Sequence, residues 1–349
     1  MFSQVIGHHQ NIELLQNILR TNKVANAYLF AGPPNIGKEF VAVNFAKALN
    51  CIEGSGGHFS YADACDKCIS CRKIDDSNHP DVRIIRPEGA WMKIDQIRGL
   101  QRQISRRPLE GRYKVYILTD VERMNLPAAN SFLKTLEEPP GAAVLILLTS
   151  NYNALLPTIR SRCQLVRFFL TPPTVLQNQL VEKLKLTETK ARQITLLSGG
   201  KVGKALELVK KEDINAESNI PDILQRLQLI EIFKIAEELN NQPESLDILL
   251  TWLRDILLVK QGCNAEILTY PDKFSELARL ASGYSRIQLQ DAIRTIMETK
   301  NLLQRNINST LALEVMVLRL IRLRGAGILA CQQPSQTQTR MSAPQSTDQ

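Results

Sequence analysis

The chain has 349 residues, of which 44% are hydrophobic and only 5% aromatic, so it can form two or three domains with largely aliphatic cores. No apolar run reaches the roughly 18 residues that a membrane-spanning helix needs, and we expect neither a membrane span nor a signal peptide. The formal net charge of +8 permits contact with nucleic acid without establishing it. Seven unevenly spaced cysteines favour a metal site in a reducing compartment over a disulfide framework, so we expect a cytoplasmic protein.

Strand and helix patterns alternate over residues 1–170. Short apolar runs predict strands, and the segments between them carry apolar residues at helical spacing. The predicted strands are 27–31, 82–85, 114–118 and 144–148. The predicted helices are 38–49, 94–104 and 128–136. This alternation predicts a doubly wound α/β domain with a parallel sheet.

A glycine-rich loop lies between the first predicted strand and the first predicted helix. Gly32, Gly37 and Lys38 match G-x-x-x-x-G-K, the phosphate-binding loop, in which backbone N–H groups and the lysine face phosphate oxygens. The pattern should end in Ser or Thr, whose hydroxyl binds Mg²⁺, but Glu39 stands there. The loop can still form an anion cradle, so nucleotide binding and hydrolysis are separate questions. We expect ATP binding by this site to be weak or absent.

A cluster of cysteines follows the first predicted helix. Cys65, Cys68 and Cys71 are each separated by two residues, and Cys51 lies upstream. Four ligands at such short spacing can converge on one tetrahedral Zn²⁺. The sequence leaves the fourth ligand open between Cys51 and His58. Because no coordination position remains for a substrate, the predicted zinc is structural.

Two further features of this half concern charge. Arg98, Arg102 and Arg106 recur every four residues and form either a solvated helix face or a row of phosphate contacts. After the strand 114–118, an ATPase would present an Asp-Glu pair that serves metal and water. Here Thr119 and Asp120 occupy the two positions, so a carboxylate for Mg²⁺ is missing a second time.

Beyond residue 170 the patterns become helical. The prolines at 172 and 173 interrupt the chain. The predicted helices are 174–184, 187–197, 202–210, 220–240, 245–261, 286–305 and 310–324. Two apolar stripes on these helices form either core or interface, and their members are Trp252, Leu253, Ile256 and Leu257, and Leu311, Val315, Leu318 and Ile321. The end of the chain, 331–349, is rich in Gln, Ser, Thr and Pro and is predicted to be disordered.

These motifs together resemble the delta-prime subunit family of the bacterial DNA polymerase III clamp loader, which belongs to the AAA+ proteins. The similarity extends from Phe-Ser-Gln-Val-Ile-Gly at 2–7 through the loop and the cysteines. Its most specific stretch is Ala-Asn-Ser-Phe-Leu-Lys-Thr-Leu-Glu-Glu-Pro-Pro at 129–140. The resemblance implies an α/β P-loop (AAA+) domain with a parallel sheet, followed by a small helical lid and an all-α collar domain. The implied bounds are 1–170 with a zinc-binding insertion at about 51–71, 171–212 for the lid and 213–330 for the collar.

The resemblance also assigns roles to single residues. In such loaders the tripeptide matching Ser161-Arg162-Cys163 places its arginine at the edge of the neighbouring subunit's ATP site. Spacing alone would leave Arg162 an ordinary surface residue and Cys163 a small packed side chain. Gly203 stands where ATP-hydrolysing relatives carry a phosphate-sensing arginine, and Lys204 could partly substitute for it.

The implied function is DNA replication. The chain would be a clamp-loader subunit that does not hydrolyse ATP and supplies Arg162 in trans to a neighbour. Its partners would be gamma/tau and delta subunits in a five-membered ring, the sliding clamp and primer-template DNA. No intrinsic activity is expected, although the chain would be part of a DNA-directed DNA polymerase (nucleotidyltransferase) holoenzyme. The alternatives are an ATP-hydrolysing, gamma/tau-like AAA+ subunit and a zinc-bearing DNA-binding module.

Overall fold

The structure is a computed structural model of the whole chain. It describes residues 1–53, 62–137, 141–210, 220, 222–224, 226–227, 229–241, 245–303 and 308–330, the last with side chains up to residue 323. His58 and the predicted disordered tail at 331–349 lie outside these residues. The chain divides into two compact units, Met1–Glu212 and Asp213–Gln349. No helix in the described ranges combines the length and the apolarity needed to cross a bilayer.

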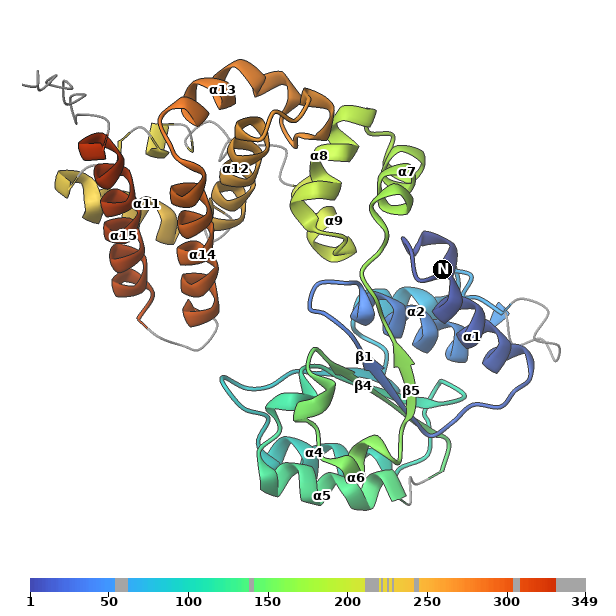
Figure 1. The fold of residues 1–349 in the computed structure, drawn as a ribbon. Helices are drawn as coiled ribbons and strands as arrows, with labels where there is room; N and C mark the ends of the chain where they lie inside the picture. Colours follow the sequence, from blue (N-terminus) through green and yellow to red (C-terminus); the bar gives the residue numbers. More distant parts are fainter. Residues whose placement is uncertain are drawn as a thin grey trace, which may run out of the picture. The chain divides into compact units, whose positions relative to one another are not determined.

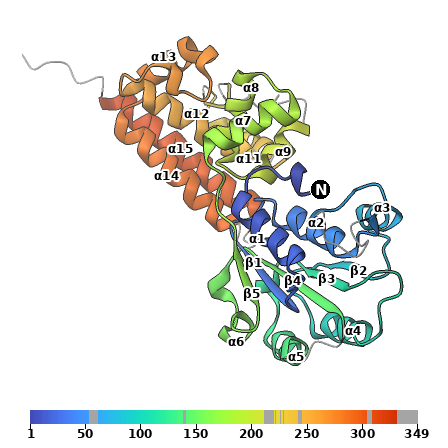
Figure 2. The same cartoon turned by 90° about the vertical axis from the view of Figure 1, so that its right-hand side faces the viewer.

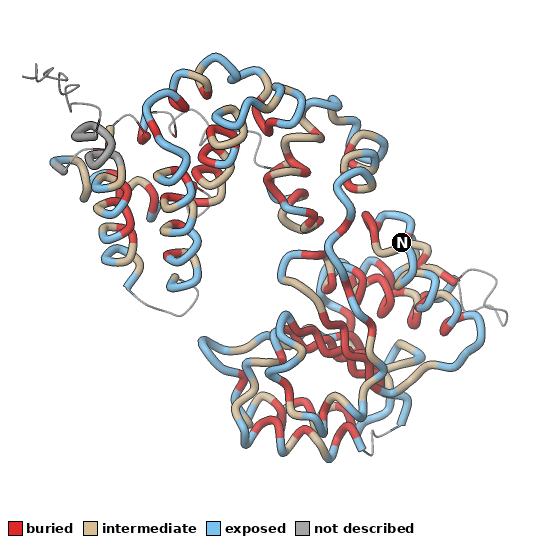
Figure 3. The backbone as a smooth tube through the Cα atoms, in the orientation of Figure 1, coloured by how far each residue is buried: buried red, intermediate tan, exposed pale blue. Residues whose placement is uncertain are grey.

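A five-stranded parallel sheet forms the centre of the first unit (Figure 1). The strand order is β2-β3-β4-β1-β5. The strands are β1 (Ala27–Ala31), β2 (Val82–Ile85), β3 (Lys114–Leu118), β4 (Ala143–Thr149) and β5 (Gln164–Arg167). All residues of β1, β3 and β4 are buried, and Figure 3 shows this buried centre. The predicted parallel sheet is confirmed.

Helices cover both faces of this sheet. On one face lie α1 (His9–Arg20) and α2 (Lys38–Asn50), and on the other α4 (Ile94–Ile104), α5 (Leu126–Glu137) and α6 (Pro157–Arg160) (Figure 1). Successive side chains of a strand point to opposite faces, so Tyr28 and Phe30 join one core, whereas Ala27 and Leu29 join the other. A strand buried on both faces needs the continuous apolar sequence from which it was predicted.

Among the elements of this unit that were not predicted are α6, β5, α1 and α3 (Ile69–Asp75). β5, with the sequence Gln-Leu-Val-Arg, is an edge strand in which Val166 alone is buried, so it has no apolar run. Helix α1 buries Leu15, Ile18 and Leu19, a spacing that is helical but was not recognised. Helix α3 begins inside the cysteine cluster, where short metal-ligand spacing hides its pattern.

Three short helices complete the first unit. They are α7 (Pro173–Leu184), α8 (Glu188–Ser198) and α9 (Val202–Lys210), each within one residue of the predicted bounds. Pro172 caps α7 and Pro173 is its first residue, a position where the missing N–H costs no hydrogen bond. From α7, Lys183 Nζ donates to the carbonyl oxygens of Ser3 at 2.7 Å and Val5 at 2.9 Å. Helix α7 therefore contacts the N-terminal segment directly.

The second unit is helical, as predicted, in every part that the structure describes. Its main helices are α11 (Ile232–Asn241), α12 (Ser245–Lys260), α13 (Phe274–Ser282), α14 (Arg286–Leu303) and α15 (Ser309–Ala330), of which α14 and α15 run side by side in Figure 2. Trp252 is buried and stacks on Tyr270 with ring centroids 5.3 Å apart. The buried carboxylate of Asp255 accepts N–H groups of Thr269 and Tyr270 at 2.7 and 3.2 Å. These contacts fix the segment after α12 against that helix.

One expectation for the second unit was wrong in part, and the stripe on α15 was left open between core and interface. The helix predicted at 220–240 is interrupted, because residues 226–227 are not helical and the 3-10 turn Leu229–Glu231 precedes α11. On α15 the predicted stripe is not the buried one, since Leu311 is 56% and Val315 42% exposed. The buried residues of α15 are Leu313, Met316, Val317 and Leu320.

Candidate functional site

A cavity of about 350 Å³ opens at the carboxyl ends of β1, β3 and β4, the edge where parallel α/β sheets commonly bind ligands. Its wall combines the glycine-rich loop, residues that follow β2, β3 and β4, and one residue of α9. The lining residues are Pro34, Asn35, Ile36, Gly37, Lys38, Glu39, Arg86, Thr119, Asp120, Leu148, Thr149, Ser150 and Gly203. The fold thus brings together three groups of residues that the sequence analysis singled out separately.

Local geometry requires both loop glycines. A Cβ on Gly32 would lie 2.4 Å from the carbonyl oxygen of Phe168, so any other residue would push the loop away from the neighbouring chain. Gly37 has a φ of 97°, in the left-handed region that favours glycine, and it caps α2. The N-terminus of α2 therefore lies at the cavity, where its free N–H groups can face an anion.

Lys38 bonds to the loop itself. Its Nζ donates to the carbonyl oxygens of Gly32 at 2.6 Å and Pro33 at 2.7 Å. Burial lowers the pKa of Lys38 to about 8, although the carboxylates of Glu122 and Asp120 oppose that shift. The ammonium therefore already has partners within the chain, and a phosphate would have to compete with them.

Glu39 forms an ion pair with Arg86 at the rim of the cavity. Arg86 follows β2 directly, and Gln96 Nε2 donates to its carbonyl oxygen at 2.9 Å. The acidic residue that replaces the Mg²⁺-binding hydroxyl is thus neutralised by an arginine 47 positions away. This partner could not be predicted from the sequence, because Arg86 belongs to no motif.

The residues after β3 offer a poor metal site. Thr119 is 7% exposed, and its hydroxyl has no hydrogen-bond partner among the described residues. Asp120 begins the turn Val121–Arg123, on which Glu122 accepts hydrogen bonds from the N–H of Ser150 at 3.0 Å and from its hydroxyl. Burial alone would raise the pKa of Glu122, but these hydrogen bonds outweigh it and the pKa is lowered. Glu122, which the sequence analysis missed, is therefore a charged carboxylate held by Ser150.

Gly203 brings α9 into contact with the loop. Its N–H donates to the carbonyl oxygen of Asn35 at 2.8 Å. A Cβ at Gly203 would lie 2.8 Å from that same oxygen and 3.1 Å from its carbonyl carbon. A side chain at this position, including arginine, would therefore force α9 and the loop apart.

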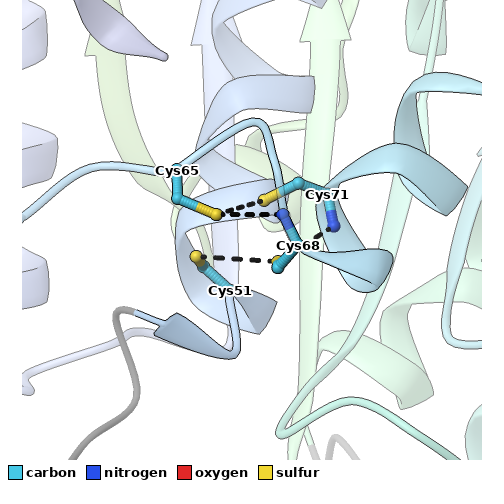
Figure 4. Close-up of side chains that lie close together, drawn as sticks. All are labelled: Cys51, Cys65, Cys68 and Cys71. Atoms are coloured by element: carbon cyan, nitrogen blue, oxygen red, sulfur yellow. Dashed lines mark hydrogen bonds between the residues drawn. The ribbon is translucent and has the colours of Figure 1, made fainter.

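The four cysteines form a compact cluster at the end of α2 (Figure 4). Their sulfur atoms all lie within 4.8 Å of one another, with 4.0 Å from Cys51 to Cys68 and from Cys65 to Cys71. Tetrahedral zinc with Zn–S bonds of about 2.3 Å separates its sulfurs by about 3.8 Å, so the arrangement fits that ion closely. Backbone N–H groups of Lys67 and Cys68 donate to the sulfur of Cys65 at 3.4 and 3.2 Å, which opposes the rise that burial causes in the pKa of this thiol. The cluster can hold a metal and leaves no position for a substrate.

Arg162 follows α6, which packs on the face of the sheet opposite α2. Its Nη1 donates to the carbonyl oxygen of Thr158 at 3.0 Å, and its Nη2 pairs with Glu137 at 2.5 Å. The side chain remains 34% exposed. Its neighbour Cys163 packs against the core, and burial raises the pKa of that thiol to about 12.

Exposed arginines mark α4. Arg98 and Arg102 are exposed on this helix, and Arg98 lies 3.6 Å from Asp95. Arg106, which the sequence placed on the same stripe, lies beyond the helix end at Ile104. The stripe is therefore shorter than predicted, and its exposure is compatible with either interpretation.

Two family models match this chain. One, described as DNA polymerase III, delta subunit, matches residues 7–171, and the other, described as DNA polymerase III, delta subunit, C terminal, matches residues 214–322. DNA polymerase III subunit delta' of Bacillus subtilis is 32% identical over 321 residues, which cover 88% of this chain and 94% of that protein. The chain belongs to the DNA polymerase III delta-prime subunit family. It is therefore a clamp-loader subunit of DNA replication, and the resemblance drawn from the motifs is confirmed.

Other proteins are similar to this chain over different shares of its length. Subunit delta' of Pseudomonas aeruginosa is 30% identical over 314 residues, covering 87% of this chain and 94% of that protein. Subunit tau of Bacillus subtilis is 34% identical over 214 residues, but these cover 60% of this chain and only 37% of tau. Among solved structures, a gamma subunit-related protein of Thermotoga maritima is similar with a TM-score of 0.47 and 19% identity, covering 90% of this chain and 99% of that one.

In this delta-prime family member, the site residues predicted from sequence occupy three separate places. The loop and the residue after β3 share the cavity, the cysteines form their own cluster, and Arg162 lies apart from both. The partners that the sequence could not supply are Arg86, Glu122 and Glu137. Each of them bonds to a residue far away in the chain, so only the folded structure identifies it.

Proposed function

We propose that this clamp-loader subunit hydrolyses no ATP itself and completes a neighbouring subunit's active site with Arg162. One observation carries the proposal: the position that should offer a hydroxyl to Mg²⁺ holds Glu39 paired with Arg86. Thr119 in place of a carboxylate after β3 points the same way. The residues present do not fit a catalytic Mg²⁺, so we derive no step of hydrolysis through this cavity.

Arg162 would act on the neighbour's nucleotide by charge. In phosphoryl transfer, negative charge spreads over the oxygens of the γ-phosphoryl group, and a guanidinium placed beside them stabilises the transition state. An arginine supplied in trans raises turnover by about 10³–10⁵-fold in other phosphate-loop enzymes. Arg162 suits this role because its side chain is partly exposed and its guanidinium is already oriented by Thr158 and Glu137.

The proposed partners follow from the same assignment. Gamma/tau and delta subunits would complete a five-membered ring, with the helices of the second unit serving as its collar. The exposed Leu311 and Val315 on α15 are candidates for contact with a neighbouring collar. Sliding clamp and primer-template DNA would be the ring's substrates, and the exposed Arg98 and Arg102 are our candidates for contact with DNA phosphates.

The cysteine cluster would hold a structural zinc ion in this subunit. All four predicted ligands come from one local segment, and Asp66, within that segment, pairs with Lys47 of α2 at 2.5 Å. A bound zinc would stabilise the segment by cross-linking Cys51 at the end of α2 to the turn before α3. Its role would be to hold this surface in place, without chemistry.

The decisive experiment is Arg162→Ala in a reconstituted clamp loader. DNA-stimulated ATPase should fall by at least about 10²-fold while the ring still assembles, because the arginine contributes to the transition state and not to folding. Arg20→Ala, which removes an exposed arginine at the end of α1, should leave turnover unchanged. Undiminished turnover of the Arg162→Ala complex would refute the assignment.

The second candidate is an ATP-hydrolysing subunit like gamma or tau. It is favoured by the intact Gly37 and Lys38 at the N-terminus of α2 and by the 34% identity to tau. A purified chain of this kind would release phosphate from Mg-ATP without partners. Phosphate release that is abolished by Lys38→Ala, a change in the loop itself, would establish this alternative.

A further inference from the structure

The guanidinium of Arg162 is held at two nitrogens by its own chain. Nη1 donates to the carbonyl oxygen of Thr158 at 3.0 Å, and Nη2 lies 2.5 Å from a carboxylate oxygen of Glu137. Glu137 is the last residue of α5 and stands 25 positions before the arginine. We propose that Glu137 is a positioning residue that orients Arg162 toward the neighbouring subunit's nucleotide. This inference rests on the proposed function in trans.

The geometry of guanidinium gives the two contacts their effect. The group is planar, with its N–H donors in a fixed fork, so holding two nitrogens sets the plane and the direction of the remaining donors. In the part of the chain that the structure describes, nothing accepts a hydrogen bond from Nε of Arg162. Nη1 also lies 3.5 Å from the hydroxyl of Ser161, so Nε and the second hydrogen of Nη2 are the donors left for a neighbouring subunit.

The pair is better suited to orientation than to stabilising the fold. The side chains of Arg162 and Glu137 are 34% and 48% exposed, and ion pairs this accessible to water contribute little to the free energy of unfolding. Their benefit is that the arginine's rotamers are restricted before the neighbour docks, so less conformational freedom is lost at the interface. A second hydrogen-bond partner, the Thr158 carbonyl, is part of α6 and moves with the arginine's own backbone. Glu137 is therefore the contact that ties Arg162 to a different element.

A restraining role for Glu137 would use the same contacts but makes a different prediction. A carboxylate that competed with phosphate for the guanidinium would restrain Arg162, and its removal would speed turnover. The positions favour orientation, because Glu137 takes one nitrogen at the edge of the fork while Nε stays open. Loss of Glu137 should therefore slow the reaction.

A double-mutant cycle in the reconstituted clamp loader tests this. DNA-stimulated ATPase is measured for Glu137→Gln, Arg162→Ala and the combined variant. We expect Glu137→Gln to lower kcat about ten-fold, within the roughly 10²-fold that a 1 Å misplacement of a reacting group can cost. KM for ATP and assembly of the ring should not change. The combined variant should be no slower than Arg162→Ala alone, because both changes act through one side chain.

The controls separate this inference from the proposed function. Glu13→Gln removes an exposed carboxylate of α1 and should retain the full rate. Glu137→Asp keeps the charge but shortens the side chain, and we expect its kcat to lie between those of wild type and Glu137→Gln. If Glu137→Gln fails to assemble, the kcat of Glu137→Asp tests the positioning role in its place. An unchanged or raised kcat for Glu137→Gln, or independent losses in the combined variant, would overturn the positioning role while leaving Arg162 in place. If Arg162→Ala itself is fully active, the proposed function has failed instead.

Discussion

Asp81 binds backbone N–H groups of the loop between α4 and β3, residues 105–113, and we expect its replacement to lower the free energy of unfolding. The side chain is 2% exposed, and its carboxylate accepts the N–H of Leu109 at 2.9 Å and those of Glu110 and Gly111 at 2.8 Å each. Burial alone would raise the pKa of Asp81, but these hydrogen bonds outweigh it and the pKa is lowered. Asp81→Asn keeps the shape and removes the charge and one acceptor oxygen. Since hydrogen bonds to a charged group contribute about 1.5–3 kcal/mol each, we expect the free energy of unfolding to fall by about 2–3 kcal/mol.

Urea unfolding followed by far-UV circular dichroism measures this loss, and hydrogen exchange locates it at the three amides. Asp95→Asn is the matched control, because its side chain is 85% exposed and 3.6 Å from Arg98, and it should change the free energy by less than about 0.5 kcal/mol. The pKa of Asp81 is lower in the folded state than its ordinary 3.8. The stabilisation is therefore complete above about pH 5 and is lost as the pH falls through 3.8 toward the folded value. A difference between wild type and Asp81→Asn that does not narrow on acidification, or that is under about 0.5 kcal/mol at neutral pH, would refute the reasoning.

Two further predictions concern the cysteine cluster and the contact of α9. Cys71→Ser should abolish bound zinc as measured by metal analysis, because it removes one of the four thiolates. The control Cys263→Ser, in the second unit, should retain one equivalent of zinc. Zinc retained by Cys71→Ser would contradict the four-thiolate site. Gly203→Ala places a Cβ 2.8 Å from a backbone oxygen and should lower stability by about 1–3 kcal/mol in thermal unfolding. Gly99→Ala in α4, with nothing within 4 Å of its Cβ, should be neutral or stabilising, and equal effects of the two would count against the contact.

The buried strands and most helices could be predicted because their sequences carry the period of the structure. Strands β1, β3 and β4 are buried on both faces and consist of apolar runs, so length and flanking residues identify them. β5 was not predicted because an edge strand needs few apolar residues. Its backbone hydrogen bonds to β1 define it as a strand, and its sequence alone does not. Local patterns predict an element only where burial repeats along it.

The face of α15 shows a second limit. This helix has apolar residues on several sides, and a set at helical spacing can be drawn through either Leu311 and Val315 or Leu313 and Val317. Contacts with α11 and α14 decide which set is buried. The other set stays exposed, as the interface alternative for this stripe allowed. Periodicity therefore located the helix but not its orientation.

The site divides in the same way. Gly32, Gly37, Lys38 and the cysteines could be recognised, because adjacent ligands and turns depend on spacing along the chain. The partner of Glu39 could not, since Arg86 reaches the loop only through the packing of β2 beside β3. In the sequence, Glu39 indicates only the loss of a Mg²⁺-binding hydroxyl. In the structure, it also forms an ion pair with Arg86.

That ion pair belongs to a set of contacts that join the parts of the cavity without a nucleotide. Lys38 bonds the loop to itself, Arg86 joins the loop to the end of β2, and the N–H of Gly203 joins α9 to Asn35. Each of these groups has a partner within the chain, and a phosphate bound beside Lys38 would have to compete with the two carbonyl oxygens that its ammonium contacts. In the proposed function, such a subunit would keep its cavity in one arrangement while neighbouring subunits hydrolyse ATP. Arg162 would then stay in one position relative to the neighbour's nucleotide, which favours catalysis.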